Sequence, residues 1–133
     1  MSQKIPLLID TDPGADDALA LLMAFADPRH GVVGLTVAAG NVGLKYTVRN
    51  ALKLCEVAGR TDVPVFAGAA DPLVYPAEDA AHVHGVDGFG DVDLSPAPQA
   101  VQDEHAALAI IRLSHEHAGK LFLVALGPLT NVA

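Results

Sequence analysis

The chain of 133 residues contains no tryptophan, a single cysteine and few aromatic residues, which make up 5% of it. One cysteine excludes an internal disulfide, and Cys55 falls at a core-facing position of an expected helix, so we interpret it as a packing residue. Hydrophobic residues nevertheless reach 51%, so small and branched aliphatic side chains must fill the interior. This composition is typical of α/β sheets that are covered by helices.

Basic residues and long apolar runs are also scarce. Lysine and arginine number 8 against 16 acidic residues, and the net charge of −8 argues against a surface for nucleic acid or an anionic membrane. The apolar runs are far shorter than a bilayer span, and Met1-Ser2-Gln3-Lys4 leads directly into an expected strand. The sequence therefore predicts neither a signal peptide nor a membrane span, which favours a cytoplasmic location.

What the sequence does contain is an alternation of strand-like and helix-like segments. It predicts strands at 5–9, 32–39, 63–67 and 121–126. The intervening helices start after Asp16, at Leu44 and after Asp103, which is expected to cap the third. The first helix is apolar nearly all round and is expected to be buried. This order predicts a single α/β domain over 1–133, with a doubly wound, mostly parallel open sheet and helices on both faces, as in Rossmann-like folds.

Two segments depart from this simple pattern. Residues 68–100 hold four prolines and show no sustained period, and a connection this long inside a compact domain is usually a lid or a binding loop. In the second helix, Lys45, Arg49 and Lys53 form a basic row opposite the apolar face, which we interpret as a solvated helix surface. In the third helix, the expected inward side carries Ala107, Ile110, Ile111 and Ser114.

The most informative segment, here named the acidic turn (residues 10–17), places four carboxylates between the first strand and the first helix. In open parallel sheets, ligands bind outside the carboxyl ends of the strands. Four like charges there would repel one another, and a hard cation with oxygen ligands, calcium or magnesium, would relieve the repulsion. The alternative is that Asp16 and Asp17 are N-terminal helix acids and that Asp10 forms a turn.

The stretch Asp10-Thr11-Asp12-Pro13-Gly14-Ala15-Asp16-Asp17-Ala18-Leu19-Ala20-Leu21 resembles the N-terminal signature of the inosine-uridine-preferring nucleoside hydrolases, a calcium-dependent family of nucleoside N-ribohydrolases. The similarity continues in the family's order through residues 39–42, 84–90 and 126–131, so that it covers the chain from end to end. The first block is highly specific, and the others add weight together. The resemblance implies a reaction in which a ribonucleoside and water give ribose and the free base.

The resemblance also implies a calcium site. Asp12 and Asp17, with the backbone carbonyl of Leu126, would ligate Ca²⁺, and Asp12 would take the proton from the attacking water. Asp10 would stand behind them and orient water or ligands.

The same resemblance implies three contacts to the nucleoside. Asp16 and Asn41 would bind the ribose, with Asn41 also able to donate to the water, and His84 would line the pocket for the base. Each polar residue has an alternative interpretation, because Asn41 could simply form a turn beside Gly40 and His84 could be an exposed loop histidine.

Members of this family are longer than 133 residues, and the resemblance places a third calcium carboxylate and a histidine that assists the leaving base in the part that follows. The chain ends at Ala133 where another helix should begin, so the sequence looks cut. We therefore expect weak calcium binding and little or no activity from this chain alone. Apolar surface left open where the sheet should continue favours a homo-oligomer.

Two other readings stay open at this point. One is a haloacid dehalogenase-like phosphatase, which shares the motif Asp10-Thr11-Asp12 but wants Thr or Val in place of Gly14. The other is a non-catalytic relative that binds metal or ribose, or that assembles with a partner.

Overall fold

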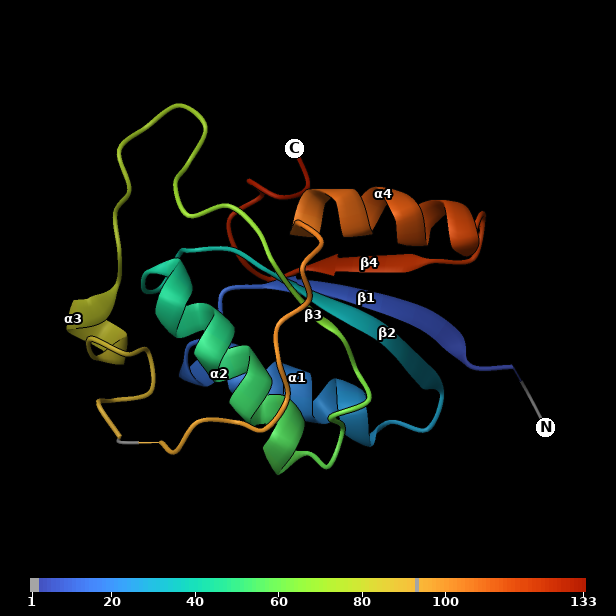
Figure 1. Ribbon diagram of the computed structural model, residues 1–133, viewed down its shortest axis with the longest axis horizontal. Helices are drawn as coiled ribbons and strands as arrows, with labels where there is room; N and C mark the ends of the chain where they lie inside the picture. Colours follow the sequence, from blue (N-terminus) through green and yellow to red (C-terminus); the bar gives the residue numbers. More distant parts are fainter. Residues whose placement is uncertain (1–2, 93) are drawn as a thin grey trace.

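The computed structural model describes residues 3–92 and 94–133, and its elements alternate along the chain (Figure 1). In chain order they are β1 (Ile5–Thr11), α1 (Ala15–Ala26), β2 (His30–Val37), α2 (Leu44–Val57), β3 (Val65–Ala67), α3 (Ala81–His84), α4 (Ala106–Glu116) and β4 (Phe122–Ala125). The four strands form one sheet in the order β3-β2-β1-β4, and every neighbouring pair is parallel. The predicted parallel open sheet is confirmed.

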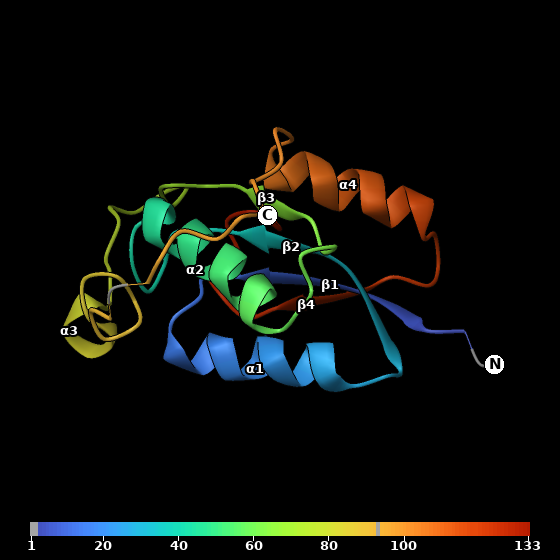
Figure 2. The ribbon, with the colours of Figure 1, turned by 60° about the horizontal axis from the view of Figure 1, so that its bottom comes forward.

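Helices cover both faces of this sheet, as the alternation predicted. Figure 2 shows α1 and α2 on one side of the strands and α4 on the other. In β1, Leu7 and Ile9 join the core beneath α1 and α2, whereas Leu8 between them joins the smaller core under α4. Because successive strand residues point to opposite faces, this apolar run is buried on both sides, and its end delivers the acidic turn to the edge between the two layers.

The third predicted helix, which is α4 in the structure, differs from its predicted form. It begins at Ala106, and its N-cap is His105, whose Nδ1 accepts a hydrogen bond from the backbone N–H of Ala107 at 3.1 Å. The prediction that Asp103 caps it was therefore wrong. The predicted inward side was only partly right, because contact with the sheet selects a neighbouring stripe. Ile110 does pack against the core under this helix, but Ile111 and Ser114 are exposed. The residues that are buried instead are Ala106, Ala109 and Leu113.

The first helix is not buried all round, so that prediction was wrong as well. Leu21 is fully buried, but Leu19 and Met23 are 64% and 66% exposed, because α1 rests on the sheet with only one side. An apolar groove of about 520 Å³ lies between α1 and the β1–β4 edge of the sheet. In β4 all four residues are exposed, including Phe122 at 61%. Among the described helices, none combines the length and the apolar character that crossing a bilayer requires.

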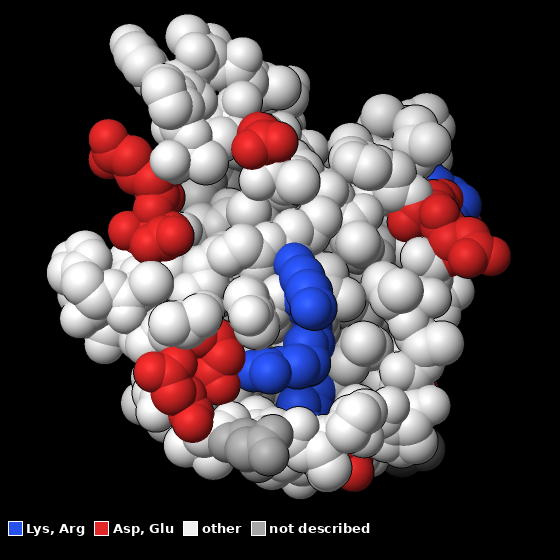
Figure 3. All heavy atoms as spheres, turned by 60° about the vertical axis from the view of Figure 1, so that its left-hand side comes forward, with Lys and Arg blue, Asp and Glu red and all other residues white. Residues whose placement is uncertain are grey.

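The long connection is largely irregular and holds only the single turn of α3 between 68 and 92; residue 93 of the predicted loop lies outside the described residues. Figure 3 looks onto the side that carries α2 and α3 and shows a band of basic side chains flanked by acidic ones. The basic row of α2 is not simply solvated, which corrects our interpretation. Arg49 donates to Asp87 at 3.2 Å, and Lys53 donates to Ser95 at 3.1 Å. Two of its three members thus tie this connection to the helix.

Candidate carboxylate site at the end of β1

The acidic turn places two buried carboxylates side by side where β1 ends. Asp12 and Asp17 are 5% and 6% exposed. Asp17 comes from the first turn of α1 and bends back, so that its Oδ2 accepts from Thr11 Oγ1 at 2.8 Å and from the backbone N–H of Asp12 at 3.2 Å. A carboxylate in this position is also favoured by the helix dipole. Asp17 therefore accepts hydrogen bonds from the acidic turn and also lies next to Asp12.

Asp12 is held from the other side by Asn41, which follows β2. The backbone N–H of Asn41 donates to Asp12 Oδ2 at 2.8 Å, and its Nδ2 donates to the backbone carbonyl of Asp12 at 2.9 Å. Asn41 is thus more than a residue that forms a turn beside Gly40. It fixes both the backbone and the side chain of Asp12.

The Asp12 carboxylate is perturbed by its burial and by its neighbour. The pKa of Asp12 is raised to about 7, mainly by burial and also by the nearby Asp17 carboxylate, while the hydrogen bond from the Asn41 backbone opposes the rise. Two neighbouring buried carboxylates repel each other when both are charged, and a proton or a cation between them relieves that repulsion. The electrostatics of the turn therefore favour binding of a positive ion.

Two glycines enclose the Asp12 carboxylate. A Cβ added to Gly127 would lie 2.6 Å from Asp12 Oδ1, and one added to Gly40 would collide with Oδ2. Gly127 follows Leu126, whose backbone N–H donates to the carbonyl of Asp10 at 2.8 Å, so the Leu126–Gly127 segment lies beside the acidic turn. Both glycines lie within the blocks that carry the family resemblance, but the sequence predicted no role for either of them.

Asp10 lies behind this pair on the α4 side of the sheet. Its Oδ2 accepts from Thr36 Oγ1 at 2.7 Å and from Asn131 Nδ2 at 3.0 Å, while its buried Oδ1 has no partner among the described residues. Burial raises the pKa of Asp10, and these two hydrogen bonds oppose the rise. Asn131 also accepts from the backbone N–H of Ala69 at 2.8 Å. It therefore joins the ends of three segments, a role that the sequence pattern did not reveal.

Of the two remaining predicted residues, His84 contacts the acidic turn and Asp16 is exposed. A Cβ on Gly14 would lie 2.9 Å from His84 Nδ1 and 3.0 Å from Asn41 Nδ2, so His84 packs against the turn and is only partly exposed. Asp16, on the first turn of α1, is exposed. The structure thus brings His84, Asn41 and the Asp12–Asp17 pair together.

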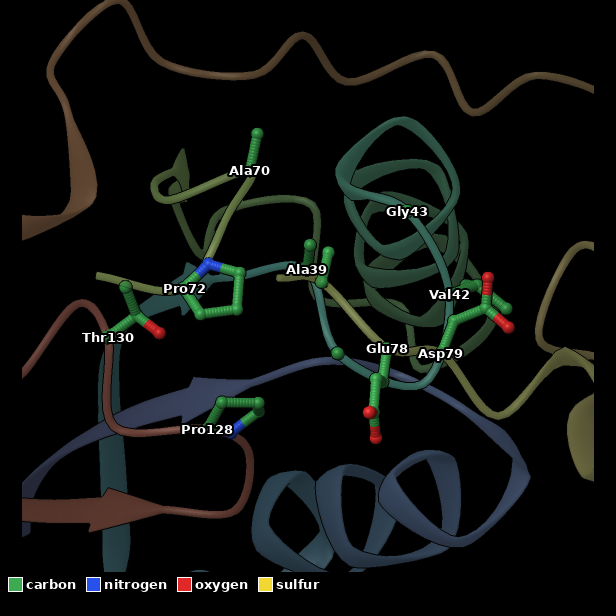
Figure 4. A pocket seen from close by; sticks show the side chains of 11 residues that line it. Ala39, Val42, Gly43, Ala70, Pro72, Glu78, Asp79, Pro128 and Thr130 are labelled. Atoms are coloured by element: carbon green, nitrogen blue, oxygen red, sulfur yellow. The ribbon is translucent and has the colours of Figure 1, made fainter. Parts of the chain in front are cut away.

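A cavity of about 130 Å³ adjoins the turn at Gly40 (Figure 4). Glu78 and Asp79, from the long connection, lie on its α2 side, and Pro72 and Thr130 lie on the opposite side. Its lining thus adds a second set of acids near the acidic turn.

The carboxylates of Asp12 and Asp17 could supply part of the ligands of a hard cation. Within 3–92 and 94–133 no group of three or more His, Cys, Asp or Glu side chains is arranged to hold a metal ion. The two acids present offer only oxygen, which calcium and magnesium prefer. In the described part of the chain no hydrogen bond is formed to Asp12 Oδ1 or Asp17 Oδ1. One oxygen of each acid is thus left for another ligand.

An open parallel α/β sheet with paired acids at a strand end is the architecture of doubly wound proteins, a class in which ligands bind at the carboxyl edge of the sheet. The comparison with family models then identifies it further. The model described as inosine-uridine preferring nucleoside hydrolase matches residues 7–133, and the chain belongs to this family. This assignment replaces the haloacid dehalogenase-like alternative.

Similar proteins agree with that assignment. The chain is 46% identical over 128 residues to uridine nucleosidase 1 of Arabidopsis thaliana, covering 96% of this chain and 38% of that protein. It is 41% identical to the non-specific ribonucleoside hydrolase RihC of Klebsiella pneumoniae, covering 98% of this chain and 42% of the relative.

Solved structures agree as well. A plant nucleoside hydrolase, the PpNRh1 enzyme, superposes with a TM-score of 0.92 at 39% identity, covering 98% of this chain and 42% of that one. The purine-preferring ribonucleoside hydrolase of Gardnerella vaginalis superposes with a TM-score of 0.90 at 33% identity, covering 96% and 42%. The chain thus spans about two fifths of the length of the relatives that it matches.

Proposed function

We propose that this chain supplies the water-activating half of a calcium-dependent nucleoside hydrolase site, which converts a ribonucleoside and water into ribose and the free base. The observation that carries the proposal is the buried pair of Asp12 and Asp17, each with one oxygen that accepts no hydrogen bond within the described residues. Membership of the family supports the same chemistry.

The residues present fit a calcium ion. Asp12 and Asp17 would hold it, with the backbone carbonyl of Leu126 as a third oxygen beside the turn. Calcium takes six to eight oxygen ligands, so positions remain for water, for ribose hydroxyls and for further protein groups. When bound, the ion would lower the pKa of a water molecule and orient it.

Asp12 is then the general base. Asp12 accepts the proton of the water as the water oxygen forms a bond to the anomeric carbon. The N-glycosidic bond breaks at the same time, and its electron pair goes to the leaving nucleobase. Asn41 keeps the Asp12 carboxylate in place and presents its amide to the sugar. Asp16 accepts from a ribose hydroxyl, and His84 contacts the base. Asp10 supports the turn through its bonds to Thr36 and Asn131.

The chain by itself is expected to bind Ca²⁺ weakly and to hydrolyse nucleosides slowly or not at all, because the two acids satisfy only part of a calcium shell. Isothermal titration with Ca²⁺ and a reducing-sugar assay with uridine and inosine test this. Asp12→Ala is the site variant, and Asp103→Ala, at an exposed acid, is the matched control.

Binding of one Ca²⁺ that Asp12→Ala abolishes and Asp103→Ala preserves is the supporting result. Equal binding by all three proteins would refute the site. Ready hydrolysis by the wild-type chain, absent in Asp12→Ala, would overturn the expected inactivity while upholding the site.

We further propose that the chain forms a homo-oligomer. The groove between α1 and β4 presents apolar side chains to solvent, and burying them is favourable by about 25 cal/mol per Å². Light scattering coupled to gel filtration tests this, and a monomer at all concentrations would contradict it.

A further inference from the structure

A single buried side chain on α2 bridges the acidic turn and the connection that carries His84. Asn50 is fully buried, and its Nδ2 donates to the carbonyl of Pro13 at 3.1 Å and to the carbonyl of Asp87 at 2.7 Å. Its Oδ1 accepts from Arg49 Nη2 at 3.2 Å. A primary amide has two donor hydrogens and an acceptor, and this one uses both kinds of group in a place that water does not reach.

Asp87 is the fixed point of its own segment. Its Oδ1 accepts from the backbone N–H groups of Phe89 and Asp91, both at 2.8 Å, and its Oδ2 accepts from Arg49. The N–H of Gly90 donates to the carbonyl of His84 at 2.8 Å. Hydrogen bonds therefore link residues 84–91 to one another, so an interaction that fixes the position of Asp87 also fixes the position of His84.

The other partner of Asn50 belongs to the acidic turn. Pro13 directly follows Asp12 and precedes Gly14, against which His84 packs. The fit is close, because a Cβ on Gly88 would lie 3.0 Å from Asn50 Nδ2 and 3.3 Å from the carbonyl of Pro13. The acidic turn and the His84 segment are thus anchored to one amide.

We propose that Asn50 is a positioning residue that sets the separation between the Asp12–Asp17 carboxylates and His84. This inference rests on the proposed function, in which the former act on the sugar and the latter contacts the base. Asn50 touches neither ligand and acts through the carbonyls of Pro13 and Asp87.

The test uses Asn50→Asp, which has the same shape but turns an acceptor toward two carbonyls, and Asn50→Ser, which keeps a smaller donor and decides the test if the first variant does not fold. Thr47→Val is the matched control. Thr47 is also fully buried on α2, but its hydroxyl donates only to the carbonyl of Leu44 within the same helix.

The readouts are backbone amide exchange and the His84 imidazole resonances, both recorded by NMR on the metal-free chain. In the Asn50 variants we expect exchange of the Phe89 and Asp91 amides to accelerate roughly tenfold, as for the loss of one net hydrogen bond, and the His84 resonances to move. The amides of α4 should stay as in the wild type, and Thr47→Val should leave the His84 segment unchanged.

Two results would overturn the inference. One is a folded Asn50 variant in which the loop amides and His84 match the wild type. The other is a uniform loss of protection that Thr47→Val reproduces, which would make Asn50 a merely structural residue.

A Ca²⁺ titration separates this inference from the proposed calcium site. An absence of any response in the wild type defeats the calcium site, while the metal-free measurements still judge Asn50.

Discussion

Replacing Gly127 by alanine tests the geometry of the acidic turn most directly. The added Cβ would lie 2.6 Å from Asp12 Oδ1, 3.0 Å from its Cγ and 3.2 Å from its backbone nitrogen. Ordinary contact begins near 3.4 Å, so the carboxylate would have to retreat by about 0.8 Å. The carboxylate cannot move away freely, because the Asn41 backbone N–H donates to its Oδ2 at 2.8 Å and Gly40 packs against the same oxygen.

The cost follows from that confinement. Either the Asn41 hydrogen bond stretches, or the Leu126–Gly127 segment shifts away from the turn. Overpacking of this kind typically costs about 1–3 kcal/mol, which we expect in urea unfolding. We expect the Ca²⁺ affinity of the chain to fall about tenfold, since displacing Asp12 moves one of the two carboxylates that would hold the ion.

Gly31→Ala provides the control for this substitution. Gly31 lies in β2, away from the turn, and its added Cβ would make only ordinary contacts, the nearest at 3.4 Å from Lys4 Cβ. Urea unfolding and calorimetric Ca²⁺ titration should distinguish the two variants. If Gly127→Ala matches Gly31→Ala in both measurements, the confinement of Asp12 described above is wrong.

Three further outcomes are expected. Asn131→Ala should lower the free energy of unfolding by about 2 kcal/mol in urea titration, because it strips a partner from buried Asp10 and from the backbone of Ala69; no loss would contradict that network. Burial raises the pKa of Cys55 to about 11, so only about one thiol in a thousand is ionised at pH 8, and iodoacetamide should label it only in denaturant. Phe122→Glu should convert the proposed homo-oligomer to a monomer in light scattering, and persistence of an oligomer would show that β4 lies outside its interface.

The sequence by itself determined the order of the elements and the position of the acidic turn. A strand-length apolar run that is followed by carboxylates, a Pro-Gly pair and a helix specifies a strand–turn–helix unit, because each of these signals acts over a few residues. It also placed Cys55 in the core and His84 within the long connection. These features depend on local preferences and on repeating patterns.

Only the tertiary structure decided which distant groups meet. Neither the stripe of α4 that faces the sheet nor the open side of α1 follows from periodicity, since both depend on which neighbour covers each surface. The roles of Asn50, Gly127 and Asn131 exist only because α2, β4 and the C-terminal segment converge on the end of β1. Buried hydrogen-bonding groups must find partners wherever the packed chain supplies them, and those partners lie 37 and 121 residues apart for Asn50–Pro13 and Asn131–Asp10.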